Sequence, residues 1–217
     1  MASKRSARPE AKSHRLFVAI PIPDEAARAV QAAIKPWQRV LPEVRWVPRE
    51  NWHVTVWFLG PTDPRLVPWV RERLAQVAAT TAPFDTRISG VGAFRSIHRA
   101  RVLWVGIDDV EEQMAALTAA IQDCLASDLA PEGRPFMPHV TVGRNDPPVA
   151  LPEPFGSTPL ESKHFRVEAL VLMRSHLRRP APVYEPVEVY RMQRRMQRPM
   201  QRPMQRPMRD PIQSTLD

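Results

Sequence analysis

Short apolar runs alternate with longer amphipathic segments along the first half of the chain. Residues 16–20 form a continuous apolar run that ends at a proline, which is typical of a β-strand. From residue 25 to about residue 35, apolar side chains recur on one face at helical spacing, and Asp24 precedes them as a potential cap. The same criteria predict strands at 53–59 and 84–91 and a helix at 64–79.

The second half of the chain repeats this order. The pattern predicts strands at residues 101–107, 140–142, 165–173 and 183–189, and a long amphipathic helix at residues 110–125. Because strand, helix and strand recur in both halves, we expect an α+β fold made of two related lobes. Two lobes that each bury one sheet face would fit in the roughly 175 residues available.

The two ends of the chain differ from this body in composition. The net charge is +8, yet residues 16–190 carry 19 basic and 20 acidic side chains, so the positive charge lies in the ends. Near the C-terminus a Met-Gln-Arg-Pro unit repeats, and its regularly spaced prolines exclude a regular helix. We therefore expect basic, disordered tails at residues 1–14 and 191–217, flanking a folded body at residues 15–190.

Several classes of protein are excluded by composition. The single cysteine, Cys124, permits no intrachain disulfide and no cysteine-based metal cluster. No apolar run approaches the roughly 20 residues that span a bilayer, and charged residues interrupt the N-terminus where a signal peptide would need an apolar stretch. These features predict a cytoplasmic protein without a membrane partner, for which a two-lobed monomer is sufficient.

One tetrapeptide occurs twice. Residues 53–56 and residues 139–142 both read His-Val-Thr-Val, 86 positions apart and once in each half. On a strand, residues two apart share a face, so His and Thr would face one side while the valines face a core. This alternation also predicts that Trp57 shares the face of His53 and that Phe58 points into the core.

Two such pairs facing one another across a cleft would suit phosphoryl chemistry. Histidine has the side-chain pKa closest to neutral pH, so one neutral ring can accept a proton from water while a protonated ring donates to a leaving oxygen. Threonine hydroxyls can donate hydrogen bonds to phosphate oxygens. This scheme requires neither a metal ion nor a cofactor, and it predicts a bell-shaped pH–rate profile near neutrality.

The doubled motif and its flanks resemble the 2H phosphoesterase superfamily, and within it the RNA 2′,3′-cyclic phosphodiesterases, also called 2′-5′ RNA ligases. The resemblance covers about residues 15–190. It is carried by residues 15–20 (RLFVAI), 51–60 (NWHVTVWFLG), 135–144 (PFMPHVTVGR) and 172–177 (LMRSHL), together with Tyr184. It implies a bilobal, pseudo-symmetric fold in which two antiparallel sheets, flanked by helices, surround a central groove.

The resemblance also implies an activity, namely hydrolysis of RNA 2′,3′-cyclic phosphate ends to a 2′-phosphate. His53 and His139 would then be the acid–base pair, with Thr55 and Thr141 binding the phosphate. One histidine would protonate the leaving O3′ oxygen, and the sequence does not say which. The expected partners are RNA with cyclic phosphate ends or cyclic nucleotides.

Three further residues are candidates for substrate binding. Arg144 follows the second motif by five positions and is expected to contact the phosphate or the adjacent nucleotide. Trp57, on the expected face of His53, is a candidate for stacking on a base, with a packed rim aromatic as the alternative. Phe94, expected in a loop between the lobes, is a second stacking candidate.

Two other functions remain open at this point. The same fold could open a small cyclic phosphate rather than an RNA end. A non-catalytic RNA-binding protein that uses its basic tails would also account for the net charge.

Overall fold

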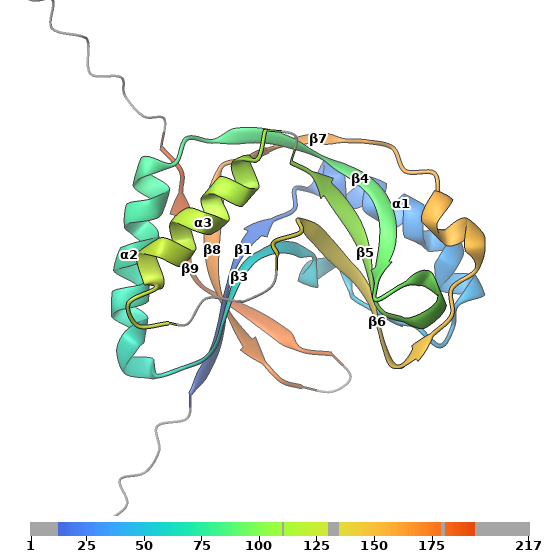
Figure 1. The fold of residues 1–217 in the computed structure, drawn as a ribbon, viewed down its shortest axis with the longest axis horizontal. Coiled ribbons are helices and arrows are strands. Elements are labelled where there is room, and N and C mark those ends of the chain that lie inside the picture. The colour runs from blue at the N-terminus through green and yellow to red at the C-terminus, as the bar shows by residue number, and fades with distance from the viewer. Residues whose placement is uncertain (1–12, 110, 130–134, 179–180, 194–217) are drawn as a thin grey trace, which may run out of the picture.

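A computed structural model describes residues 13–109, 111–129, 135–178 and 181–193 (Figure 1). The predicted tails at 1–14 and 191–217 lie almost entirely outside these residues. Their described ends belong to the fold, because the first strand begins at His14, the last ends at Arg191, and the side chain of Met192 is buried. Among the described residues, no helix has both the length and the apolar character needed to cross a membrane.

The described strands form one curled antiparallel sheet, and the expected two sheets are joined within it (Figure 1). The strand order is β7-β4-β5-β6-β3-β1-β8-β9, with the short β2 paired to β6. The bounds are β1 His14–Pro21, β2 Arg45–Trp46, β3 His53–Thr62, β4 Phe84–Phe94, β5 Ala100–Asp108, β6 His139–Val149, β7 His164–Val167, β8 Ala169–His176 and β9 Val183–Arg191.

A pseudo-two-fold relation runs through the middle of the sheet. Strands β3 and β6 meet at the pair Val54↔Val140, and the strands on either side correspond by their position in the sheet, β1 to β5 and β8 to β4. The registers correspond as well, because Ala19 of β1 pairs with Thr55 and Trp104 of β5 pairs with Thr141. The two predicted lobes are therefore built to the same pattern.

Helices cover the outer faces of the two lobes. Helices α2 (Val67–Thr80) and α3 (Gln113–Leu125) contact each other and the strands β3, β8 and β9, whereas α1 (Asp24–Val40) contacts β4 on the other lobe (Figure 1). Short 3-10 helices complete the fold at η1 Arg49–Asn51, η2 Pro64–Leu66, η3 Ile97–Arg99 and η4 Glu153–Ser157.

Two helix boundaries differ from the prediction for local reasons. Helix α1 continues five residues beyond the expected end, because Trp37 anchors its last turn by donating to Thr158 Oγ1 at 2.8 Å and packing against Phe155. Helix α3 begins three residues later than expected. The carboxylate of Asp109 accepts from the backbone N–H groups of Met114 and Ala115, which satisfies two donors of the first turn.

Two predicted strands also differ in extent. The single strand expected at 165–173 is divided at Glu168, so that β7 pairs with β4 in one lobe and β8 pairs with β1 in the other. The short strand expected at 140–142 continues to Val149 as β6, because its far half pairs with β5.

A β-bulge lies at the last residue of each His-Val-Thr-Val motif, Val56 in β3 and Val142 in β6. In β3 the register passes from Thr55 to Trp57, and in β6 it passes from Thr141 to Gly143. A bulge places two consecutive residues on the same side of the strand and so reverses the alternation beyond it. The expected orientations of the next two residues of β3 are therefore wrong: Trp57 is 1% exposed and Phe58 is 50% exposed.

We predict that Gly143→Ala destabilises the protein by about 1–3 kcal/mol, the usual cost of overpacking. A Cβ at Gly143 would lie 2.8 Å from Val44 Cγ1, closer than packed carbon atoms approach. Gly156→Ala is the matched control, since no atom lies within 4 Å of its added Cβ. Urea unfolding of both variants measures the difference, and equal stabilities would contradict this account of the bulge.

Candidate active site

The two motif histidines are held in the same way. The ring of His53 bonds through Nδ1 to the backbone oxygen of Asn51 at 2.8 Å, and the ring of His139 bonds to that of Met137 at 2.7 Å. A carbonyl oxygen only accepts, so Nδ1 carries the proton in each ring. In the neutral form this leaves the lone pair on Nε2, the nitrogen that can exchange a proton with a bound substrate.

The pair Val54↔Val140 brings the two motifs together on one sheet face. Side chains alternate along each strand, so this pairing of the buried valines places His53 and Thr55 of β3 and His139 and Thr141 of β6 on the opposite face of the sheet. The four predicted residues therefore share one sheet face, where the two lobes meet.

Aromatic side chains enclose both imidazoles. The rings of Phe17 and Tyr184 lie 4.9 Å and 5.2 Å from that of His53, and Phe94 meets His139 edge-on at 4.7 Å. Phe94 is the last residue of β4, not part of a loop as expected, and it is half-buried. Trp57 lies in the core and offers no face to a base, so the stacking predicted for it has no support.

Sequence reasoning missed Phe17 and Tyr184 as site residues. Phe17 stands in an apolar run whose pattern indicates only a buried strand. Its position on the site face follows only from its pairing with Phe58, beyond the bulge. Tyr184 reaches His53 because β9 pairs with β8, and β8 with β1. No short-range pattern in the sequence indicates either contact.

Both histidines are neutral in the unliganded site near neutral pH. Burial lowers the pKa of His53 to about 4, and the positive charges of Arg144 and protonated His139 lower it further, against the backbone hydrogen bond that raises it. The pKa of His139 is lowered as well, first by burial and then by Arg144. Burial raises the pKa of the Tyr184 phenol, which keeps its hydroxyl a donor.

Arg144 contributes the positive charge of the site. It is exposed on β6, and its charge acts on His53, His139 and Tyr184. The bulge in β6 turns it toward the site face, just as the bulge in β3 turns its counterpart Phe58. The site thus carries a cation on one lobe and an aromatic ring at the equivalent position on the other.

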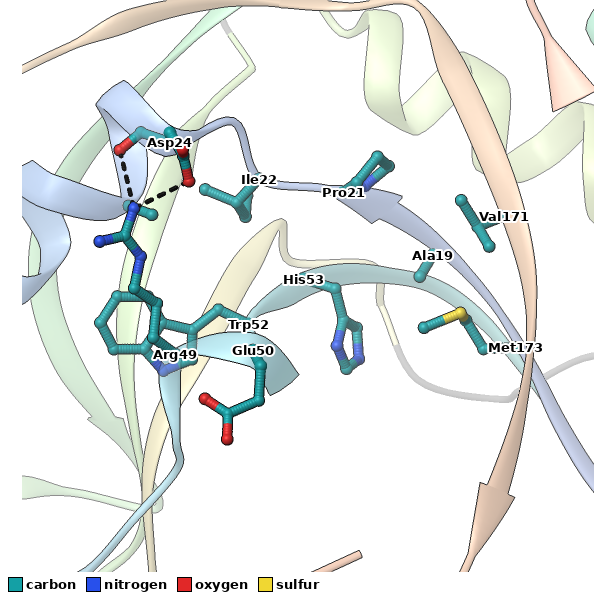
Figure 2. Close-up of a pocket in the computed structure, with 11 residues that line it drawn as sticks. Ala19, Pro21, Ile22, Asp24, Arg49, Glu50, Trp52, His53, Val171 and Met173 are labelled. Carbon is teal, nitrogen blue, oxygen red and sulfur yellow. Dashed lines mark hydrogen bonds and ion pairs between the residues drawn. The ribbon is translucent and has the colours of Figure 1, made fainter. Parts of the chain in front are cut away.

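A pocket of about 450 Å³ opens beside His53 (Figure 2). Its lining includes Ala19, Val171 and Met173 from the sheet and Glu50 from the segment that leads to His53. At its edge, Arg49 donates to the backbone oxygen and the carboxylate of Asp24, as Figure 2 shows. Within the described ranges, no cluster of three or more histidine, cysteine or acidic side chains could hold a metal ion.

Comparison with known proteins finds relatives over most of the described chain. An RNA 2′,3′-cyclic phosphodiesterase of Geobacillus stearothermophilus is 32% identical over 82% of this chain, which spans 57% of that relative's length. Another of the same name, from Archaeoglobus fulgidus, is 31% identical over 81% of this chain and 99% of its own length. A crystal structure of a Thermus thermophilus protein superposes with a TM-score of 0.69 at 26% identity, covering 82% of this chain and 97% of its own.

Escherichia coli LigT, crystallised with 3′-AMP, shares the fold. Its TM-score is 0.67 at 22% identity, over 84% of this chain and all of LigT. The family model for the 2′-5′ RNA ligase superfamily matches residues 22–179. By its doubled motif, its pseudo-symmetric sheet and this match, the chain belongs to the 2′-5′ RNA ligase superfamily.

Proposed function

We propose that this protein is an RNA 2′,3′-cyclic phosphodiesterase, which opens the cyclic phosphate to leave a 2′-phosphate. The observation that carries the proposal is the pair of Nδ1-anchored imidazoles, which the pair Val54↔Val140 brings onto one sheet face with the two motif threonines. Relatives of the same name, about 30% identical over most of the chain, support this substrate class.

The proposed reaction is an in-line displacement at phosphorus. A water oxygen forms a bond to phosphorus while the bond from phosphorus to O3′ breaks. One imidazole accepts the proton of the water through Nε2, and the other donates a proton to O3′, which leaves as a hydroxyl. All bonds and protons are accounted for without a metal ion.

The remaining site residues would stabilise the charge on phosphate. Thr55 and Thr141 donate from their hydroxyls to the non-bridging oxygens, and Arg144 offers a charge-assisted contact. Phe94 restrains the ring of His139 by its edge contact. These polar donors are directed at the atoms on which negative charge increases during the displacement.

Substrate binding would also prepare the acid. Both histidines have lowered pKa values in the free site, partly because Arg144 opposes a second positive charge. A bound phosphodiester carries one negative charge and offsets that of Arg144. One ring can then hold a proton while the other stays neutral, as the reaction requires.

We predict that His53→Ala and His139→Ala each lower kcat for 2′,3′-cyclic CMP by about 10²- to 10⁴-fold, the usual value of acid–base catalysis. The assay is run in excess EDTA, in which the wild-type rate should be unchanged. His164→Ala, an exposed histidine on β7, is the matched control and should keep the wild-type rate. Loss of wild-type activity in EDTA, or wild-type rates in either motif variant, would contradict the mechanism.

The lowered pKa values move the expected pH optimum to the acid side. The active form of the free enzyme holds one proton on the pair, so kcat/KM should peak between the two lowered values, below pH 6.5. Above the peak it should fall by up to about tenfold per pH unit as the acid is lost. The kcat profile, which reports the bound state, should lie at higher pH. A kcat/KM profile centred above pH 7 would argue against two buried histidines beside a cation.

Arg144→Gln should change two measurable quantities together. Removing its charge raises the pKa of both histidines, which NMR titration of the imidazole resonances measures. Losing its contact with phosphate raises KM by about tenfold or more. Arg39→Gln, which removes an exposed charge from the last turn of α1, is the control. Unchanged histidine titrations in Arg144→Gln would place the arginine charge outside the site.

A further inference from the structure

The pseudo-two-fold relation allows the two sides of the site to be compared position by position. Ala19 pairs with Thr55 on one side, and Trp104 pairs with Thr141 on the other, so these residues are equivalent. One strand further out, Val171 pairs with Ala19 and Gly92 pairs with Trp104. All four residues face the same way as the threonines of the site, because direct partners share a sheet face.

On the His139 side this space is filled by an indole. A Cβ at Gly92 would lie 2.4 Å from the ring of Trp104, and one at Gly106 would lie 3.4 Å from the same ring. The ring therefore lies flat over two glycines. Phe94, with its ring centroid 5.8 Å from that of Trp104, extends this packed surface up to His139.

On the His53 side the equivalent space is open. Ala19 supplies only a methyl group where Trp104 supplies an indole. The pocket of about 450 Å³ lies there, with Val171 and Met173 beside Ala19 in its lining (Figure 2). Its volume is within the range of small-molecule sites, and its apolar floor suits a flat aromatic ring. The site is thus symmetric in its catalytic groups and asymmetric in the space beside them.

The rim of this pocket carries a carboxylate. Glu50 stands three residues before His53, where the other motif has the partly buried Phe136 three residues before His139. Glu50 is exposed and forms no ion pair with another described residue, whereas its neighbour Arg49 is bound to Asp24. A carboxylate beside a phosphate site repels the anion itself, so it suits a part of the substrate that donates hydrogen bonds.

We propose that this pocket receives the terminal nucleobase of the substrate and that Glu50 selects bases bearing an amino group. The inference rests on the proposed function, since the cyclic phosphate between the histidines sets where the base can lie. Cytosine offers an amino donor to the carboxylate, as in other cases of base recognition by glutamate. Uracil presents a carbonyl oxygen at the same ring position and is repelled.

The pair cytosine and uracil gives the sharpest test, because the two bases share their shape and exchange donor and acceptor at the amino position and at the neighbouring N3. Calorimetry on the full-length protein compares binding of 2′-CMP and 2′-UMP, which carry the product phosphate. The wild type should bind 2′-CMP about tenfold more tightly, the value of one charge-assisted hydrogen bond. Glu50→Gln should bring the two affinities within about twofold of each other. Glu43→Gln removes an exposed carboxylate outside the pocket and should keep the preference.

A second variant tests the pocket apart from the carboxylate. Ala19→Leu fills part of the pocket floor. It should weaken binding of 2′-CMP about tenfold more than it weakens binding of methyl riboside 2′-phosphate, which lacks a base. Both ligands are measured on the same folded sample. Equal wild-type affinities for 2′-CMP and 2′-UMP, or a preference that survives Glu50→Gln, would overturn the selection by Glu50. Equal weakening of both ligands by Ala19→Leu would overturn the base pocket.

These binding results are separate from the proposed reaction. Hydrolysis of 2′,3′-cyclic CMP by the same wild-type sample reports the reaction itself. A protein that prefers 2′-CMP through Glu50 and yet hydrolyses no cyclic phosphate would keep the pocket and lose the proposed activity. A protein that hydrolyses 2′,3′-cyclic CMP and UMP with equal kcat/KM and binds both products equally would keep the activity and lose the selection by Glu50.

Discussion

The arrangement of the site depends on one antiparallel pair, Val54↔Val140, through which β3 and β6 meet. Both valines are fully buried, with exposed fractions of 0%, so the pairing is fixed by the core beneath it. A shift of one residue in either strand would send the valines to the site face and the histidines and threonines into the core. The cost of burying those polar groups keeps the register, and the register keeps both imidazoles and both hydroxyls on the site face.

The bulges at the ends of the two motifs decide which of the following residues face the core and which reach the rim of the site. Each places two consecutive residues toward the core at the end of the motif, Val56 with Trp57 and Val142 with Gly143. Trp57 and Gly143 occupy equivalent positions, and the first fills its space with an indole whereas the second has no side chain. Gly143 is required because Val44 and Leu103 already occupy the space where a Cβ would stand. The two lobes therefore share their strand registers but pack different side chains at equivalent positions.

The sequence predicts the parts of this structure that local pattern determines. The repeated tetrapeptide indicates two equivalent strands, and the alternate spacing of valines within each motif indicates which face is buried. It does not predict the bulges, because Val56, Trp57 and Phe58 are all apolar and such a run does not indicate where the alternation reverses. The orientations expected for Trp57 and Phe58 are wrong for this reason. Nor does it predict that Phe17 and Tyr184 meet at His53, since that contact needs three strand pairings between distant segments.

Burial of the two histidines gives the site its electrostatic character. Imidazoles packed against Phe17, Tyr184 and Phe94 are partly shielded from water, so the charged form is disfavoured before any substrate is present. Arg144 adds to this effect and makes the empty site a cationic cavity with two neutral bases. An anion bound between the two histidines lowers the free-energy cost of protonating one of them. The same aromatic enclosure that makes the free histidines poor proton acceptors therefore couples their protonation to the arrival of a phosphate.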